Sequence, residues 1–108
     1  MTTPTPSRDA SFMHLVTLEC KDEAHAARCL AALAAHGRPD ALAYRCVSYD
    51  FGVKVGAPDT VMLVERWQRW EDLDALLAEK VVPALPVYNA LLKRPFDPAR
   101  DTVRIGVA

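Results

Sequence analysis

The spacing of the apolar residues changes several times along this chain, and these changes restrict the folds that it can adopt. Some segments are rich in Val, Thr and aromatic residues whose side chains alternate between two faces, as in a β-strand. In others Ala and Leu recur every third or fourth residue, which is typical of an amphipathic helix. The predicted strands are residues 12–20, 41–51, 60–67 and 102–107, and the predicted helices are residues 22–36 and 71–80.

Glycine and proline mark where these elements end. Gly37 suits the position just past a helix and Pro39 cannot continue one, so the first helix is predicted to end before them. Residues 52–59 contain two Gly and one Pro and predict a hairpin connection. Pro83 and Pro86 predict the end of the second helix, because each lacks a backbone donor. The remaining predicted elements are a short helix over 87–93 and a loop over 95–98.

The resulting order, β-α-β-β-α-β, predicts an α+β fold of the ferredoxin-like class, with a four-stranded antiparallel sheet and two helices on one face. The chain has 108 residues, enough for one domain of this kind, and we expect the domain to span residues 12–108. Residues 1–11, rich in Thr and Pro, are predicted to be disordered. The second face of the sheet carries apolar side chains that need a cover, so a homodimer is expected.

The charge balance argues against several classes of partner. Lys and Arg number 13 and Asp and Glu 14, so the net charge is -1, whereas a protein that binds nucleic-acid phosphates would carry a basic surplus. No apolar run approaches the roughly 20 residues needed to cross a bilayer, and the first residues lack the pattern of a secretory signal. We therefore expect a cytoplasmic protein with no nucleic-acid or membrane partner.

The three cysteines, Cys20, Cys29 and Cys46, are widely spaced and form no Cys-x-x-Cys pair. Zinc sites use Cys or His ligands at short spacings, so no metal site is predicted. In a reducing compartment we expect these residues to be buried free thiols that pack as small hydrophobic side chains.

Three stretches carry a resemblance to a known family. Residues 39–45 (PDALAYR) are similar to that family's Pro-Gly-x-Leu-x-Tyr motif at its second strand. Residues 64–67 (VERW) and 70–73 (WEDL) are similar to its Glu-x-Trp ending of strand three and the start of its second helix, and residues 91–95 (LLKRP) to the end of that helix. Over residues 12–107 the chain resembles the antibiotic biosynthesis monooxygenase family of the dimeric α/β-barrel superfamily.

The resemblance implies a homodimer, a dimeric α+β barrel whose two sheets pack face to face, with each cavity between a sheet and its own helices. Characterised members oxidise phenolic or quinol-like substrates with O₂ and use neither metal nor flavin, so the resemblance implies no cofactor. Haem-degrading relatives bind iron through a His of the second helix. Here the histidines are His14, His25 and His36, and haem degradation of this kind is not expected. His25 and His36 are predicted to be solvated on the first helix.

His14 and Glu65 are candidate catalytic residues on predicted strands. An imidazole titrates near neutral pH, so His14 is either a general base or a packed residue of an apolar strand. Which face of its strand turns inward stays open, and with it whether His14 or Glu19 reaches the cavity. Glu65 is either a cavity carboxylate or the ion-pair partner of Arg45 or Arg66, because buried carboxylates are rarely left unpaired.

The remaining candidates are aromatic or polar. Trp67 ends the third strand and either stacks on a substrate ring or packs in the core. Arg45 and Tyr49 share a face of the predicted second strand and could hold a phenolate through charge-assisted hydrogen bonds. Tyr88 and Asn89 follow Pro86 on the predicted short helix and are candidate substrate-binding residues that line the cavity from the helical side.

These residues favour a cofactor-independent monooxygenase that acts with O₂ on a small aromatic, quinol-type molecule. In this interpretation Trp67 stacks on the ring, His14 or Glu65 takes the phenolic proton, and Arg45 or Tyr49 steadies the anion. Two alternatives stay open. One is a non-enzymatic protein that binds a hydrophobic metabolite in the same cavity. The other is an isomerase or cyclase of the same superfamily, for which His14 and Glu65 would suffice as an acid–base pair.

Overall fold

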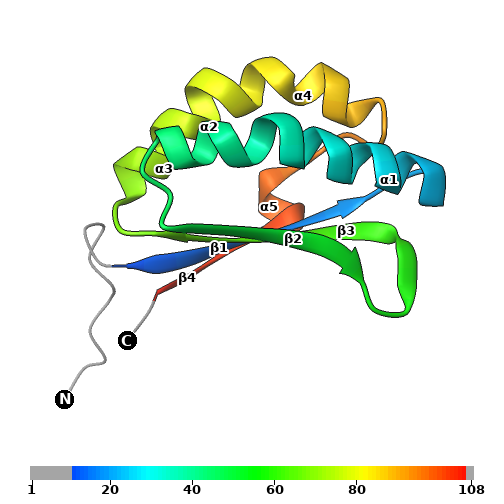
Figure 1. Ribbon diagram of the computed structural model, residues 1–108, viewed down its shortest axis with the longest axis horizontal. Helices are drawn as coiled ribbons and strands as arrows, with labels where there is room; N and C mark the ends of the chain where they lie inside the picture. Colours follow the sequence, from blue (N-terminus) through cyan, green and yellow to red (C-terminus); the bar gives the residue numbers. More distant parts are fainter. Residues whose placement is uncertain (1–10, 107–108) are drawn as a thin grey trace.

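The computed structural model describes residues 11–106. The expectation of disorder over residues 1–11 falls, apart from Ser11, outside the described residues. Within them a sheet is covered on one face by helices (Figure 1), which confirms the predicted ferredoxin-like class. The strands are β1 (Phe12–Glu19), β2 (Ser48–Lys54), β3 (Ala57–Trp67) and β4 (Thr102–Gly106).

The sheet has the order β2-β3-β1-β4, and each of these neighbouring pairs is antiparallel, as predicted. The helical layer lies on one side of it (Figure 1). Within residues 11–106 no helix has the length and apolar character needed to cross a membrane. The helical elements are α1 (Glu23–Ala32), the π-helical turn η1 (Leu33–Gly37), α2 (Arg38–Ala43), α3 (Trp70–Leu76), the π-helical turn η2 (Leu77–Val81), α4 (Val82–Asn89) and α5 (Pro98–Asp101).

The core lies between the sheet and the helices. Alternate residues of β1, from Phe12 to Leu18, are buried against the helical layer, and their neighbours on the other face are only half-buried. This alternation is the two-residue period that the sequence predicts for the strand. Trp67 of β3 and Leu73 of α3 are completely buried in the same core. The face of β1 that carries His14, rather than Glu19, therefore turns inward.

The first helical segment does not end at Gly37 as predicted. Gly37 has the right-handed helical φ of -59°, and η1 continues the helix into α2. The N–H of Arg38 donates to the carbonyl of Leu33, five residues earlier, which is the hydrogen bond of a π turn. Pro39 then falls in the first turn of α2, where a missing N–H is tolerated. The helix ends beyond it at Arg45, whose φ of 75° is left-handed.

The prediction of a strand over 41–51 is wrong at its beginning, because residues 41–43 complete α2 and β2 starts at Ser48. The hairpin connection is also shorter than the predicted 52–59. Both sides of it extend as strands, and the turn is confined to Val55 and Gly56. Gly56 has a φ of 85°, a value that Gly adopts without the steric cost of a Cβ.

The second helical segment repeats the arrangement of the first. Pro83 was expected to interrupt it, but η2 precedes this proline and α4 continues to Asn89 with Pro86 inside it. The N–H of Val82 donates to the carbonyl of Leu77, again five residues earlier. In both segments the wide turn ends one residue before an X-Pro pair. A regular α-helix would bring the proline ring against a carbonyl at this point.

The chain after α4 is less helical than predicted. Residues 90–91 form a turn in place of the end of the expected 87–93 helix, and Leu92 bridges to Cys20 beyond the end of β1. The carboxylate of Asp97 accepts from the N–H of Ala99 at 3.1 Å and caps α5, which begins inside the predicted 95–98 loop. The last strand follows where it was expected.

Candidate functional site

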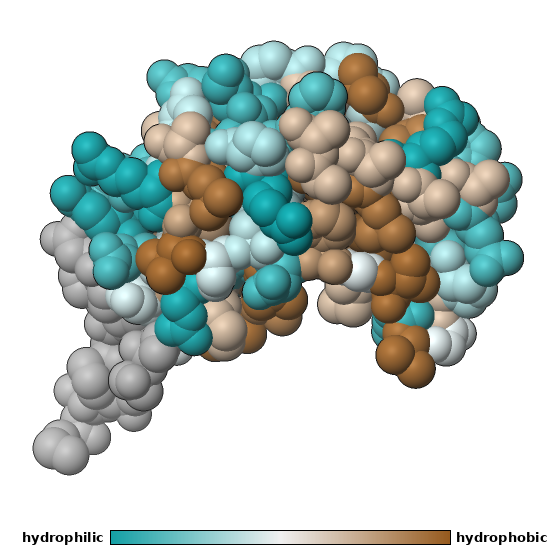
Figure 2. Space-filling model, viewed as in Figure 1, coloured by the Kyte–Doolittle hydropathy of each residue, from teal (hydrophilic) through white to brown (hydrophobic). Residues whose placement is uncertain are grey.

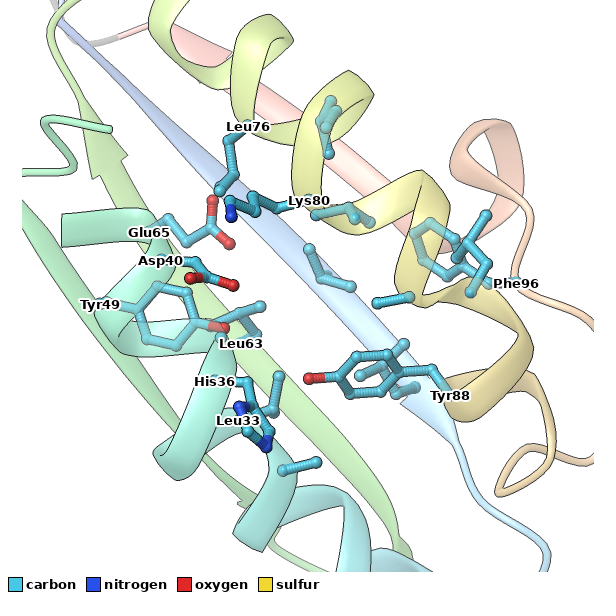
Figure 3. Close-up of a pocket in the computed structure, with 18 of the residues that line it drawn as sticks. Leu33, His36, Asp40, Tyr49, Leu63, Glu65, Leu76, Lys80, Tyr88 and Phe96 are labelled. Carbon is cyan, nitrogen blue, oxygen red and sulfur yellow. The ribbon is translucent and has the colours of Figure 1, made fainter. Parts of the chain in front are cut away.

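A cavity of about 290 Å³ lies between the sheet and the helical layer. Its wall consists mostly of apolar side chains from β1, β3, η1, η2 and α4, with a few polar groups among them (Figure 3). A mostly apolar pocket with few polar groups is typical of a small-molecule site. It lies between the sheet and its own helices, where the family resemblance places a cavity.

His14 and Glu65 lie side by side on the sheet wall of this cavity, on β1 and β3. Nδ1 of His14 is 3.1 Å from Oε1 of Glu65, and each side chain is only 5% exposed. The indole Nε1 of Trp67 donates to the same Glu65 oxygen at 2.7 Å. Trp67 is completely buried and lies behind Glu65, outside the described residues that line the cavity. The three side chains form one hydrogen-bonded series that ends in an imidazole at the cavity.

Glu65 lies on the cavity wall, which was one of its two predicted alternatives, but its ion-pair partner is His14 instead of an arginine. Neither Arg45 nor Arg66 reaches Glu65, since Arg45 is exposed in the turn after α2 and Arg66 lies on the opposite face of β3. Arg45 therefore shares no strand face with Tyr49, contrary to the prediction, because it lies in the turn between α2 and β2. Among the described residues, Arg45 is not part of the cavity wall.

Tyr49 and Tyr88 enter the cavity from opposite sides, one from β2 and one from α4, with their hydroxyl groups directed inward (Figure 3). Burial, together with the Glu65 carboxylate, raises the pKa of Tyr49 above its ordinary value. Burial raises the pKa of Tyr88 to about 12. Both hydroxyl groups are therefore protonated at neutral pH and can donate hydrogen bonds. A Cβ at Gly37 would overlap the Tyr49 hydroxyl, so this glycine leaves the space that Tyr49 occupies.

Asn89 does not line the cavity among the described residues, although it was a candidate. Its Oδ1 accepts from the backbone N–H of Phe96 at 2.9 Å. Phe96 itself lies on the cavity wall. Asn89 therefore positions the segment that closes this end of the cavity.

Besides Tyr88, three charged or titratable residues at the cavity come from the helical layer: His36, Asp40 and Lys80 (Figure 3). His36 is exposed, as predicted, but it is also part of the wall. Asp40 and Lys80 were not identified from the sequence. Asp40 lies four residues after His36 on the continued helix, so helical spacing would have placed it on the same face. The helix predicted from the sequence covers residues 22–36 and stops before Asp40, so this spacing was not recognised.

A second, smaller cavity of about 110 Å³ adjoins the first, and His14 lies in the wall of both. Arg104 of β4 lines this smaller cavity and was missed by sequence reasoning. Its Nη2 donates to Oδ1 of Asp74 at 3.0 Å, and its guanidinium carbon lies 4.9 Å from the centre of the Trp70 ring. The alternation of β4 could have placed Arg104 on the inner face.

All three cysteines are free and buried, as predicted. Burial raises the pKa of Cys29 to about 12 and that of Cys46 to about 11. Such thiols are poor nucleophiles and poor metal ligands at neutral pH. Among residues 11–106, no group of three or more His, Cys, Asp or Glu side chains is arranged to hold a metal ion.

No family model matches the sequence, and no curated protein matches it. Solved structures do match. One is a protein from Shewanella oneidensis, with 19% identity and a TM-score of 0.71 over 93% of this chain and 95% of that one. Another is a protein of unknown function from Nitrosomonas europaea, with 24% identity and a TM-score of 0.66 over 94% and 92% of the two chains.

A third solved structure is called an antibiotic biosynthesis monooxygenase. It shares 19% identity with this chain at a TM-score of 0.58, over 90% of this chain and 96% of the other. Identities this low establish the fold and leave the activity open. The chain thus has the fold of structures named antibiotic biosynthesis monooxygenases, and at the level of the fold this likeness supports the family resemblance seen in its motifs.

Proposed function

We propose that this chain is a cofactor-independent monooxygenase that acts with O₂ on a small aromatic phenol or quinol. The observation that carries the proposal is the buried series Trp67–Glu65–His14, which ends in an imidazole on the wall of an apolar cavity. An imidazole held by a carboxylate is a suitable general base. The fold shared with a structure named for this activity supports the proposal.

The volume of the main cavity suggests the size of the substrate. A cavity of about 150 Å³ accommodates benzene, and this one is about 290 Å³. The space therefore suits two fused rings better than one ring or a long flexible chain. We take hydroxylated naphthalenes as the model substrates.

The first chemical step is removal of the phenolic proton. A carboxylate oxygen accepts hydrogen bonds, so in this mechanism Nδ1 of His14, which lies 3.1 Å from Oε1 of Glu65, carries the imidazole proton. The other ring nitrogen, Nε2, is then free to accept the substrate proton. The Trp67 indole fixes the same carboxylate oxygen. In this mechanism Trp67 positions Glu65 instead of stacking on the substrate ring.

The phenolate then transfers one electron to O₂, and the resulting radicals combine to form a carbon–oxygen bond at the ring carbon opposite the phenolate oxygen. Loss of the hydrogen from that carbon and cleavage of the O–O bond give a quinone and water. For 1-naphthol the balance is 1-naphthol plus O₂ to 1,4-naphthoquinone plus water. The substrate loses four electrons and O₂ gains four, so no further reductant enters the reaction.

The role of steadying the anion was expected of Arg45 or Tyr49, and in this mechanism Tyr49 has it together with Tyr88. Both hydroxyl groups are protonated at neutral pH and enter the cavity from opposite sides. Protonated hydroxyl groups in an apolar cavity stabilise negative charge that develops on an oxygen. They therefore suit the phenolate and the reduced oxygen species that follow from it.

The test is O₂ uptake by the purified full chain with 1-naphthol and 1,5-dihydroxynaphthalene, followed with an electrode. We expect saturable uptake, and one labelled oxygen in the quinone when ¹⁸O₂ is supplied. His14→Gln should lower kcat by about 10²–10⁴-fold, the usual contribution of a general base. His25→Gln is the matched control, because His25 lies outside the cavity and pairs with Asp22 at 2.7 Å. Equal uptake by wild type and His14→Gln would overturn the assignment.

The same experiment separates the alternatives. A protein that only binds hydrophobic metabolites would take up 1-naphthol, as calorimetry would show, without consuming O₂; the mostly apolar wall of the cavity favours this alternative. An isomerase or cyclase would use His14 and Glu65 without O₂, so it would form no quinone, and any redox-neutral conversion that it catalyses would be equally fast under anaerobic conditions.

We also propose that a second copy of the chain covers the outer face of the sheet. Val64, Val103 and Ile105 lie on this face and are 39%, 55% and 39% exposed. Hydrophobic residues also appear along the lower side of the molecule in Figure 2, below the helices. Covering such a patch stabilises an assembly. The three free thiols suit a reducing compartment, which is consistent with a cytoplasmic location.

A further inference from the structure

Four polar side chains form a row across the inner face of the whole sheet. Tyr49 of β2 pairs with Glu65 of β3, Glu65 with His14 of β1, and His14 with Arg104 of β4. Residues directly opposite each other in antiparallel strands share a face. The guanidinium of Arg104 therefore belongs to the same row as the proposed base, on the side of His14 away from Glu65.

The positive charge of Arg104 lies at the wall of the smaller cavity. The smaller cavity, of about 110 Å³, shares His14 and Phe96 with the main one, and the helical residues Leu77, Val81 and Leu85 form the rest of their common wall. Among the described residues that line it, Arg104 is the one with a permanent charge. A substituent of a ring bound in the main cavity could enter this space beside His14.

The guanidinium of Arg104 is held in place by its neighbours, and some of its N–H groups remain available to a ligand. One nitrogen, Nη2, donates to Asp74, and the group lies over the rings of Trp70 and Phe12, at 4.9 and 5.9 Å from their centres. A guanidinium carries five N–H groups, so further donors remain for a ligand. The Asp74 side chain is 43% exposed and that of Arg104 26%, so water screens the charge of Asp74 more strongly.

We propose that Arg104 binds a carboxylate of the substrate in the smaller cavity, so that the preferred substrate is a two-ring phenol with a carboxylate next to its hydroxyl group. The adjacency follows from the sheet: His14 and Arg104 are directly opposite on neighbouring strands, where side chains start about 4.5–5.5 Å apart. Two long side chains that start this close can converge on two groups attached to neighbouring ring carbons. The inference rests on the proposed function, since it places the phenol at His14.

The test uses three ligands that lack a ring hydrogen opposite the hydroxyl group and are therefore not converted to a para-quinone. They are 2-naphthol, 3-hydroxy-2-naphthoic acid, in which the two groups are adjacent, and 6-hydroxy-2-naphthoic acid, in which they are distant. Calorimetry with the full chain should show at least roughly tenfold tighter binding of the adjacent isomer than of 2-naphthol. The distant isomer should gain nothing. Arg104→Gln should remove the gain and leave the Kd of 2-naphthol unchanged.

Two control variants separate carboxylate binding by Arg104 from a general effect of positive charge and from a purely structural ion pair. Lys80→Gln removes another cation of the main cavity wall, and it should keep the preference for the adjacent isomer. Asp74→Asn breaks the ion pair but keeps the guanidinium, so it should also keep the preference. A loss of preference in Asp74→Asn equal to that in Arg104→Gln would indicate a structural pair only and overturn the proposal.

The remaining outcomes are also decisive. If 2-naphthol binds but the adjacent isomer binds no tighter, the carboxylate site is refuted and the aromatic site stands. If 2-naphthol itself does not bind to the wild type, the proposed function fails and this inference with it. Should Arg104→Gln fold poorly, Arg104→Lys keeps the charge without the planar pair of donors, and it should lose part of the preference while 2-naphthol binds normally.

Discussion

Trp67 and Glu65 lie two residues apart on the same strand, and the indole N–H of one donates to the carboxylate of the other at 2.7 Å. Side chains two residues apart on a strand share a face, so this contact is built into the local backbone. Trp67 is completely buried. The tryptophan therefore fixes the carboxylate from behind, and the carboxylate in turn faces His14.

Trp67→Phe should lower kcat more than it changes KM. The substitution removes a donor to a buried carboxylate, which costs about 1–3 kcal/mol and corresponds to roughly a tenfold to hundredfold loss of rate. Because Trp67 lies outside the described cavity wall, substrate affinity should change little. The pH profile of kcat/KM should also move, because the carboxylate facing His14 is less well held. Thermal denaturation checks the fold, and a change in KM alone would contradict this role.

Gly37→Ala should destabilise the protein and disturb Tyr49. The new Cβ would overlap the Tyr49 hydroxyl and lie 3.2 Å from Cδ2 of Leu33. Overpacking of this kind costs typically about 1–3 kcal/mol, which thermal or denaturant unfolding would measure. Gly52→Ala is the matched control, because its Cβ would meet nothing within 4 Å. Equal stability of the two variants would show that Tyr49 moves aside freely.

The buried thiols should react slowly in the native protein. At pH 8 few Cys29 or Cys46 side chains are ionised, since burial raises their pKa to about 12 and about 11, and the thiolate is the reactive form. Labelling with an aromatic disulfide reagent, followed by site-resolved mass spectrometry, should be at least roughly a hundredfold slower than in guanidinium. Cys46, which is 7% exposed, should react before the fully buried Cys29. Rapid labelling of Cys29 would contradict the packing around α1.

The Asp59–Lys93 pair should stabilise the fold only over an intermediate range of pH. The hydrogen bond between them, 2.6 Å long, lowers the pKa of Asp59 and raises that of Lys93. The Asp59 contribution is therefore present above its unfolded pKa of about 3.9 and is lost as the pH falls through the lower folded value. The Lys93 contribution is present below about 10.4 and is lost as the pH rises through the higher folded value.

Asp59→Asn should accordingly lower the Tm most near neutral pH, and its difference from the wild type should shrink in acid and in alkali. Asp50→Asn is the control, because Asp50 is an exposed residue of β2. A Tm difference that stays constant from acid to alkali would show that Asp59→Asn destabilises the protein for a reason other than loss of the ion pair. Salt at 1 M should reduce the effect, because both groups are at the surface.

Val64→Lys should dissociate the proposed dimer. Val64 lies on the outer face of β3, in register with Leu15 of β1, so a lysine would bring an unpaired charge into the interface and weaken association roughly a hundredfold. Sedimentation measures the dimer Kd. Val55→Lys is the control, because Val55 is 99% exposed at the hairpin turn. A wild type that sediments as a monomer at high concentration would contradict the dimer.

The strands could be predicted from the sequence because their alternation is strong. Phe12, His14, Val16 and Leu18 all turn inward, as one face of a two-residue period requires. The helices were harder, because the end of a helix depends on a few residues. Gly37 and Pro39 are ordinary stop signals, but a π turn passes through the first and places the second where its missing N–H costs little.

Part of the site was predicted as well, because several of its residues lie on strands with strong alternation. His14, Glu65 and Trp67 were all candidates because each stands out on an apolar strand face. The contact between His14 and Glu65 could not be predicted, since it depends on the register between β1 and β3. Arg104 was overlooked because a lone arginine on a short final strand is an ordinary surface pattern.

The two wide turns also bear on how the cavity can change during evolution. A π turn holds one residue more than an α turn, so η1 and η2 each resemble a regular helix after a single insertion ahead of a proline. Gaining or losing one residue there would rotate everything that follows by roughly 100° about the helix axis. Different side chains would then face the ligand. His14 and Glu65 would be untouched, because they belong to the sheet, so selectivity can diverge among descendants without loss of the chemistry.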